Sequence, residues 1–309
     1  MRILIELPTW LGDAVMATPA IENLVNYYDE PEVILIGSYI SIELLKNHPR
    51  ISNTYVIRKK YTSLYKISKK LGQFDIFFSF RSSLRTKFFK LLISSKKKFQ
   101  FDGNSYQNRH QVEKYNDFIN DNLNTNFHPG RLIVHPSLKL TNKNLKPIVG
   151  INPGASYGNS KRWYPQKFAQ VATELSHKFD ILIFGTLNEK NIATDIEKLL
   201  IENNVSNYQN LAGNTTISEL VNQIFNLDLF ITGDSGPMHL AASFEVPTVA
   251  IFGPTRDEET SQWMNDKAVI VNKKLDCQPC MKRVCPLKHH NCMKFIKSAD
   301  VLSAVDSLN

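Results

Sequence analysis

Short apolar runs alternate with longer segments of mixed polarity along this chain. The runs have the length of β-strands, and in the segments between them apolar residues recur every three or four positions, as on one face of a helix. Repeated alternation of strands with helices predicts parallel sheets that are covered by helices on both faces. The runs expected to form strands are 3–7, 32–36, 53–57, 74–79, 147–152, 180–185, 210–213, 228–232 and 246–253.

The longer segments predict helices over 13–28, 41–47, 61–71, 165–178, 189–202, 218–225 and 298–308, the last with Ser298 as its N-cap. Between residues 122 and 147 the regularity is lost, and a composition rich in Asn, Lys and Pro is typical of a connection between domains. We therefore predict an α/β protein with two doubly wound, Rossmann-like domains, residues 1–146 and 147–309, facing each other across a central cleft. Packing of the terminal helix on the first domain is an alternative to packing within the second.

Composition narrows the class of protein. Apolar residues make up 42% of the 309 residues, which is enough for a core in each half, and no apolar run is long enough to span a membrane. The first strand begins too early to leave room for a signal peptide, so we expect a cytoplasmic protein. The formal net charge of +8 favours acidic partners.

Clustered lysines in the N-terminal half suggest where such a partner could bind. They lie at 58–60, 69–70 and 96–98. These positions are either an ordinary solvated surface or a basic face that meets an anionic membrane surface or a phosphorylated acceptor. Nucleic acid is the least favoured partner, because the sequence has no zinc finger, RNA-recognition signature or long basic arm.

The stretch 233–240 reads as the end of a strand, a glycine turn and the start of a helix. A helix start exposes unpaired N–H groups and the positive end of the helix dipole, which suits a phosphate group. Ser235 adds a hydroxyl donor beside Asp234, and Gly236 allows a ligand to approach the backbone. These features predict a phosphate-binding turn.

A similar layout occurs at 9–14, where Gly12 and Asp13 follow the first strand. Asp13 is either a helix cap or a carboxylate at the carboxyl end of a central strand, where it could take a proton from an attacking hydroxyl. The motif alone does not distinguish these two roles of Asp13, since it lacks both the dinucleotide fingerprint and the P-loop signature.

The loop 152–163 follows the first strand of the second domain and carries glycines, hydroxyls such as that of Ser156, and the adjacent cations Lys161 and Arg162. Such a loop suits a diphosphate, although an ordinary surface loop is the alternative. Glu189 follows the next strand and could bind ribose hydroxyls or only favour the start of a helix.

All four cysteines lie close together in sequence. Cys277, Cys280, Cys285 and Cys292 enclose His289 and His290. The opening C-x-x-C is typical of a metal site, but the second half lacks the paired ligands of a zinc finger. Structural zinc, reduced thiols in a compact loop, and redox or disulfide use all remain open.

Together these segments resemble the ADP-heptose–lipopolysaccharide heptosyltransferases of glycosyltransferase family 9, nearly from end to end, and most closely the heptosyltransferase II branch. The stretches that carry the resemblance are 10–20, 153–155, 161–163, 233–242, 252–255 and 277–292. The resemblance implies a GT-B fold with an acceptor domain followed by a nucleotide-sugar domain. It also implies transfer of heptose from ADP-heptose to an inner-core lipopolysaccharide precursor with inversion at the anomeric carbon and without a metal or other cofactor.

Family resemblance also implies residue roles. Asp13 matches the general base, Lys161 the diphosphate-binding lysine, and Glu189 the carboxylate that binds the ribose. The segment that holds heptose and diphosphate corresponds to Asp234, Ser235 and Gly236, with His239 lining the same pocket, and Gly12 and Ser156 are expected beside the donor.

The acceptor implied by the family is a lipid-anchored saccharide at the cytoplasmic face of the inner membrane. Arg81, Ser82 and Arg85 follow the fourth strand and are candidates for contacting its phosphate or carboxylate groups, with an ordinary charged loop as the alternative. A different member of the family, or a nucleotide-sugar binding protein without catalysis, is the rival interpretation of the whole chain.

Overall fold

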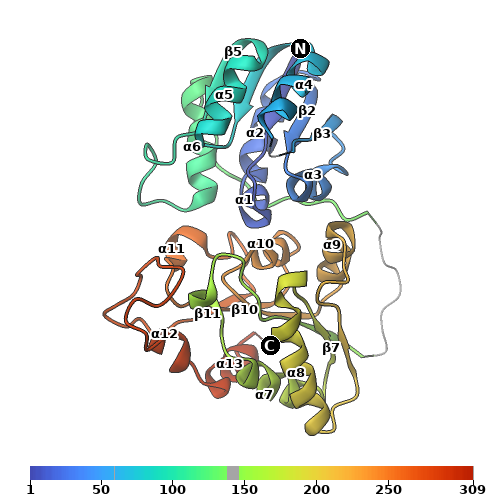
Figure 1. Ribbon diagram of the computed structural model, residues 1–309, viewed down its shortest axis with the longest axis vertical. Helices are drawn as coiled ribbons and strands as arrows, with labels where there is room; N and C mark the ends of the chain where they lie inside the picture. The colour runs from blue at the N-terminus through green and yellow to red at the C-terminus, as the bar shows by residue number, and fades with distance from the viewer. Residues whose placement is uncertain (59, 138–145, 309) are drawn as a thin grey trace. The chain divides into compact units, whose positions relative to one another are not determined.

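The computed structural model describes residues 1–58, 60–137 and 146–308 (Figure 1). The chain forms two compact units, Met1–Ser137 and Leu138–Asn309. The predicted domain boundary after residue 146 falls at the end of the stretch 138–145, which lies outside the described residues. Each unit holds one sheet whose described strands all run parallel.

The sheet of the N-terminal unit has the strand order β3-β2-β1-β4-β5. The chain starts in the central strand, builds outward to β3, and then crosses to β4 and β5. Because parallel crossovers are right-handed, this reversal places helices on both faces, as the sequence predicts. The strands are β1 (Arg2–Glu6), β2 (Glu32–Gly37), β3 (Ile51–Val56), β4 (Gln73–Ser79) and β5 (Ser94–Gln100).

Apolar side chains alternate between the two faces of this sheet. On one face, Leu4 and Phe77 pack with Phe89 in a core that lies under α4 and α5, two neighbouring helices (Figure 1). On the other face, the ring of Phe78 lies 5.8 Å from that of Phe118 in α6. The helices of the unit are α1 (Leu11–Met16), α2 (Thr18–Tyr27), α3 (Tyr39–Leu45), α4 (Tyr61–Leu71), α5 (Leu84–Leu92) and α6 (Gln111–Leu123).

The single helix predicted over 13–28 is in fact two helices that meet at Ala17. Pro19 has no N–H to donate to the carbonyl of Val15, four residues earlier. The hydroxyl of Thr18 donates to that carbonyl instead, at 2.7 Å. The break leaves α1 as a separate short helix directly after β1.

Strand β5 was not expected from the apolar pattern, because its sequence is polar and contains three consecutive lysines. It pairs only with β4 among the described strands and therefore forms an edge of the sheet. Edge strands need only one paired side, and lysines on them discourage pairing with another chain. The lysines 96–98 thus belong to a strand.

The sheet of the C-terminal unit has the order β11-β10-β9-β6-β7-β8. Val149, Ile231 and Val249 point to the face that packs with α7, α8 and α13, whereas Ala250 packs with Met238 of α10 on the other face. The strands are β6 (Ile148–Asn152), β7 (Asp180–Ile183), β8 (Tyr208–Asn210), β9 (Leu229–Gly233), β10 (Thr248–Ile251) and β11 (Ala268–Val271). The helices are α7 (Pro165–Leu175), α8 (Lys190–Glu202), α9 (Ile217–Phe225), α10 (Gly236–Ser243), α11 (Asp257–Thr260), α12 (Asn291–Lys294) and α13 (Ser298–Asp306), with 3-10 turns η1 (Asn159–Lys161) and η2 (Leu187–Glu189).

Helix α13 packs against α7, β10 and β11 within its own unit, where Val301 and Ala304 join the core. Its N-cap is Lys297 rather than the expected Ser298, because Asp300 accepts a hydrogen bond from the backbone N–H of Lys297 at 2.7 Å. No helix in the described ranges combines the length and apolar character needed to cross a bilayer.

Candidate functional site

The predicted donor-binding residues of the C-terminal unit gather at one edge of its sheet. Four strands, β7, β6, β9 and β10, lie side by side there and end at the same edge. Lys161 lies in η1 after β6, Glu189 in η2 after β7, and Asp234 directly after β9. Ligands of open α/β sheets bind outside this carboxyl edge, so the positions are those of a binding site.

An ion pair occupies the centre of this group. The Nζ of Lys161 lies 2.5 Å from Oδ2 of Asp234, and the hydroxyl of Thr255 donates to the same oxygen at 2.5 Å. Only 12% of the lysine side chain and 5% of the aspartate side chain are exposed. Lys161 also lies over the ring of Tyr157, 4.8 Å from its centroid. The cation is therefore held by the Asp234 carboxylate and the Tyr157 ring, and Thr255 fixes the carboxylate.

A second set of hydrogen bonds fixes Ser235. The side-chain amide of Asn152, at the end of β6, donates to the hydroxyl oxygens of Ser235 and Thr232 at 3.1 and 3.2 Å. The two hydroxyls lie 3.0 Å apart. Three polar side chains from two adjacent strands thus set the turn that precedes α10.

The predicted strand, turn and helix start at 233–240 are confirmed. Helix α10 begins at Gly236 with Ser235 as its N-cap, and no described side chain makes the capping hydrogen bond. Pro237 has no N–H, and the N–H of Met238 donates to the carbonyl of Ser235 at 3.1 Å, so in this first turn it is the N–H of Gly236 that can serve a ligand. His239 is buried within α10, and its predicted contact with the donor stays a prediction.

Glu189 is buried, with only 4% of its surface exposed. One carboxylate oxygen accepts hydrogen bonds from the backbone N–H and the hydroxyl of Thr186, both at 2.8 Å. The other oxygen lies 4.0 Å from Nη2 of Arg162. Glu189 therefore caps its own turn, as one of the two readings of the sequence expects, and its carboxylate also faces the loop after β6.

Gly154 makes this close approach possible. A Cβ at position 154 would lie 2.2 to 2.5 Å from the carboxylate atoms of Glu189. We expect Gly154→Ala to displace the buried carboxylate and to lower the free energy of unfolding by about 1–3 kcal/mol, as overpacking of a filled site does. Thermal unfolding measures the effect. Gly130→Ala is the matched control, because nothing lies within 4 Å of a Cβ there. Equal melting temperatures of the two variants would contradict the contact.

The cysteine-rich segment supports the loop that carries Lys161. The hydroxyl of Ser160 donates to the carbonyl of Lys282 at 2.5 Å, and its carbonyl lies 2.9 Å from Nε2 of His290. A Cβ on Gly158 would lie 2.4 Å from the carbonyl oxygen of Arg283, so only glycine fits there. The segment thus has a positioning role beside the candidate donor site. Ser156, in the same loop, is exposed.

All four cysteines line one small cavity together with His289 and His290. They are free thiols, and within the described residues no three Cys, His, Asp or Glu side chains are placed to hold a metal ion together. Burial, and after it the neighbouring sulfurs, raise the pKa of the Cys292 thiol to about 11. Cys292 is therefore protonated at neutral pH, which does not suit it as a nucleophile.

Asp13 lies in the first turn of α1, after the carboxyl end of β1. The N-cap of this helix is Trp10, so Asp13 is not itself the N-cap residue, although an acidic side chain in the first turn favours the start of a helix. Asp13 is half-buried, and Gly12 beside it is buried. Burial, and after it the charge of Asp13, raise the pKa of the Tyr115 phenol in α6 well above its ordinary value. Asp13 therefore lies next to a phenol that keeps its proton.

The predicted acceptor residues follow the neighbouring strand β4. Arg81 donates to the buried carboxylate of Glu6 at 3.3 Å, and Ser79 donates to the other oxygen at 2.8 Å. Burial raises the pKa of Glu6, and the Arg81 guanidinium opposes that rise. Arg85 donates to the carbonyl of Arg58 at 2.6 Å, and burial, then Arg81, lower its pKa.

Arg81 thus pairs with the buried carboxylate of Glu6, the last residue of β1, and Arg85 interacts with the same carboxylate through its charge. Ser82, between the two arginines in sequence, is exposed. Together the two arginines and the carboxylate of Glu6 carry a net positive charge. This excess of positive charge suits an anionic group.

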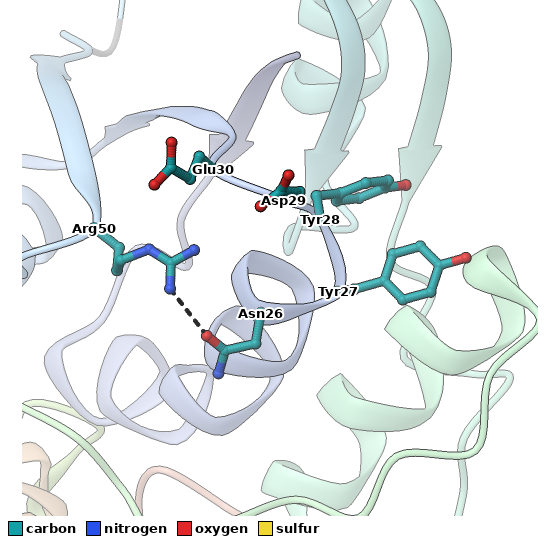
Figure 2. A pocket seen from close by; sticks show the side chains of 6 residues that line it. All are labelled: Asn26, Tyr27, Tyr28, Asp29, Glu30 and Arg50. Atoms are coloured by element: carbon teal, nitrogen blue, oxygen red, sulfur yellow. Dashed lines mark hydrogen bonds between the residues drawn. The ribbon is translucent and has the colours of Figure 1, made fainter.

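A hollow of about 640 Å³ lies elsewhere, in the N-terminal unit (Figure 2). It is lined by the turn between α2 and β2 and by Arg50, whose guanidinium donates to the side chain of Asn26 at 3.3 Å. None of the predicted site residues lines it. It lies at the amino end of β2, whereas the sites described above lie at carboxyl ends, so we do not assign it to the reaction.

The sequence pattern did not single out several polar residues that lie at the carboxyl edges of the two sheets. Asn152 and Thr232 end or nearly end their strands, and Thr255 follows the adjacent strand β10. Glu6 is the last residue of β1 and is fully buried. For Asn152, Thr232 and Glu6 the available signal was a polar residue at or near the end of an otherwise apolar run.

Comparison with known proteins identifies the family. The family model described as "Glycosyltransferase family 9 (heptosyltransferase)" matches residues 76–291. The chain is 43% identical over 317 aligned positions to lipooligosaccharide heptosyltransferase 2 of Campylobacter jejuni, with 100% of this chain and 98% of that protein covered.

Two solved structures have the same fold. Heptosyltransferase II of Escherichia coli superposes with a TM-score of 0.80 at 20% identity, covering 100% of this chain and 98% of that one. The family 9 glycosyltransferase of Veillonella parvula superposes with a TM-score of 0.84 at 19% identity, covering 99% and 96%. The predicted GT-B fold class of two Rossmann-like units is thereby confirmed, whereas the cleft between the units stays a prediction. Full-length similarity and the family match show that this chain belongs to glycosyltransferase family 9, the heptosyltransferases.

Proposed function

We propose that this protein transfers a heptose from ADP-heptose to the inner-core heptose of a lipopolysaccharide or lipooligosaccharide precursor. The observation that carries the proposal is the 43% identity over the full chain to a lipooligosaccharide heptosyltransferase 2. The buried cation at the carboxyl edge of the second sheet supports it, because a diphosphate donor needs positive charge at that edge. No nucleic acid partner is proposed.

The donor is expected to bind at this edge. Lys161 and the N–H of Gly236 at the start of α10 would bind the diphosphate, with Ser235 as a further donor, and Glu189 would accept hydrogen bonds from the ribose. ADP gains negative charge as it leaves, and fixed cations and N–H groups stabilise that charge where it develops. Asp234 would then be free to bind hydroxyls of the heptose.

The acceptor is expected to bind at the carboxyl edge of the first sheet. Asp13 would take the proton from the acceptor hydroxyl as its oxygen attacks the anomeric carbon from the face opposite ADP. Such an attack inverts the anomeric configuration. Arg81 and Arg85 would bind anionic groups of the acceptor. We propose further that the reaction needs no metal ion, since protein cations and backbone N–H groups are available to the diphosphate.

Release of ADP from ADP-heptose tests the proposal. We expect release only when a mono-heptosylated Kdo–lipid A acceptor is present, at the same rate after dialysis against a chelator, with an inverted anomeric centre in the product by NMR. Other nucleotide sugars serve as controls for donor identity. Saturable ADP binding without turnover would contradict the enzyme, and loss of rate on chelation would contradict only the metal independence.

The acceptor is a lipid-anchored saccharide, so we also propose that the protein works at the cytoplasmic face of the inner membrane. The positive charge of the N-terminal unit supports this proposal.

A further inference from the structure

Positive charge is concentrated in one segment of the N-terminal unit. Residues 58–98 contain thirteen lysines and arginines and a single acidic residue, Asp75, which is an excess of twelve positive charges. The rest of the chain has an excess of four acidic residues. The segment comprises α4, β4, α5 and β5, that is, two helices on one face of the sheet and the strands beside them.

Helix α5 is apolar on its outward side. Leu84, Phe88 and Leu91 are spaced as neighbours on one face of a helix, and 79%, 40% and 78% of their surfaces are exposed. Thr86 and Phe89 on the opposite face are fully buried. Single exposed leucines are common on protein surfaces, but a complete apolar stripe on the outward face is typical of an interaction site.

Helix α4 extends this stripe. It lies beside α5 (Figure 1), and the ring of Tyr61 meets that of Phe88 edge to face at 5.4 Å. Tyr61 and Tyr65 are both more than half exposed. Exposed lysines stand among these side chains on both helices, Lys66 and Lys87 for example. We call this outward side of the two helices the α4–α5 face.

We propose that the α4–α5 face docks the protein on an anionic phospholipid bilayer. The inference rests on the proposed function, because it names the surface by which the enzyme reaches a lipid-anchored acceptor. Leucine and phenylalanine can enter the acyl boundary, tyrosines suit the headgroup level, and lysines pair with anionic headgroups. The face offers all three kinds of side chain together.

Other occupants fit the face less well. A second copy of the chain would bring two strongly positive surfaces together, which like charges oppose. Nucleic acid would use the lysines, but two leucines exposed to nearly four-fifths have no role against phosphates. An anionic bilayer accounts for both the leucines and the lysines, because its acyl chains accommodate aliphatic side chains and its headgroups attract positive charge.

The position of the face agrees with this use. Helices that follow parallel strands begin at the carboxyl edge of the sheet, so α4 and α5 both start where β3 and β4 end. Arg81 precedes α5 by a few residues and lies at that edge. The face therefore starts beside the site proposed for the acceptor saccharide and runs along the side of the unit.

Co-sedimentation with vesicles tests the proposal. The intact protein is expected to bind vesicles of phosphatidylcholine mixed with phosphatidylglycerol and to bind pure phosphatidylcholine at least about ten-fold more weakly, with binding reduced by salt. Leu84→Ser/Leu91→Ser should weaken binding to the anionic vesicles by about ten-fold or more. Ile201→Ser, an equally apolar and 58% exposed position of the other unit, should leave it unchanged.

A charge-matched pair separates the face from net charge. Lys66→Gln/Lys87→Gln removes two charges from the face, and Lys178→Gln/Lys198→Gln removes two exposed charges from the other unit. Only the first pair should weaken vesicle binding, by about ten-fold or more. Equal effects of the two pairs, no vesicle binding by the intact protein, or tighter binding to duplex DNA or RNA than to the vesicles would each overturn the proposal.

Turnover on a water-soluble acceptor with the acyl chains removed distinguishes the docking proposal from the proposed function. The leucine variant should keep the intact protein's rate on this acceptor and lose rate only on acceptor embedded in vesicles. If the intact protein turns over neither the soluble acceptor nor the acceptor embedded in vesicles, the proposed function is wrong whatever the vesicle binding shows.

Discussion

Replacing Asp13 by asparagine or alanine is expected to lower turnover by about three orders of magnitude or more, while ADP affinity stays within a few-fold. The carboxylate follows the central strand of the N-terminal unit, at the edge where ligands of such sheets bind. It lies in the first turn of α1, whose N-cap residue is Trp10. Without the carboxylate the attacking hydroxyl keeps its proton until late in the reaction, and the barrier rises.

Acceptor-dependent ADP release measures the rate, and calorimetric titration with ADP measures the affinity. Asp29→Asn is the matched control, because Asp29 is an exposed aspartate of the same unit and lies on the hollow of Figure 2. It should keep full activity. An Asp13 variant with unchanged turnover would remove this residue from the mechanism, and a large loss of ADP affinity would place it on the donor instead.

The donor edge could be predicted from sequence because the rule behind it is simple. A polar or glycine-rich turn that follows an apolar run lies at the carboxyl edge, and parallel strands bring all such turns to one side. Lys161, Glu189 and Asp234 are separated by many residues in the chain but follow three adjacent strands. Strand and turn positions therefore sufficed to bring them together.

The partners of these residues could not be predicted in the same way. That Lys161 pairs with Asp234 depends on the path of the loop after β6, which the cysteine-rich segment fixes from far along the chain. Burial of Glu6 likewise depends on strand order, since β4 brings Arg81 beside β1 across many residues. The pattern of apolar residues in one sequence shows which segments form strands and helices, but it does not show which side chains will pair with one another.

Polar strands and interrupted helices were missed for a related reason. The lysine-rich strand β5 has no apolar alternation because only part of it faces a core. The break at Ala17 depends on a threonine hydroxyl that replaces a missing backbone donor. In both places local hydrogen bonding, and not the apolar pattern, decides the structure.

Replacing Lys161 by methionine is expected to weaken ADP binding by about ten-fold or more and to lower turnover by about two to three orders of magnitude. The ammonium group is the buried cation of the donor edge, held by the carboxylate of Asp234 and the ring of Tyr157, and Thr255 donates to that carboxylate. Its removal leaves the carboxylate of Asp234 buried without a positive partner. We therefore also expect a loss of stability of about 3 kcal/mol, the lower end of the range for breaking a buried pair.

The double variant Lys161→Met/Asp234→Asn separates these two effects. Removing both charges should restore most of the lost stability, because no unpaired buried charge remains, while ADP affinity stays low for want of the cation. Lys198→Met, at an exposed position of the same unit, is the control and should change neither quantity. If the double variant regains ADP affinity together with stability, Lys161 acts only by neutralising Asp234, and the diphosphate must take its charge from Arg162 and the start of α10.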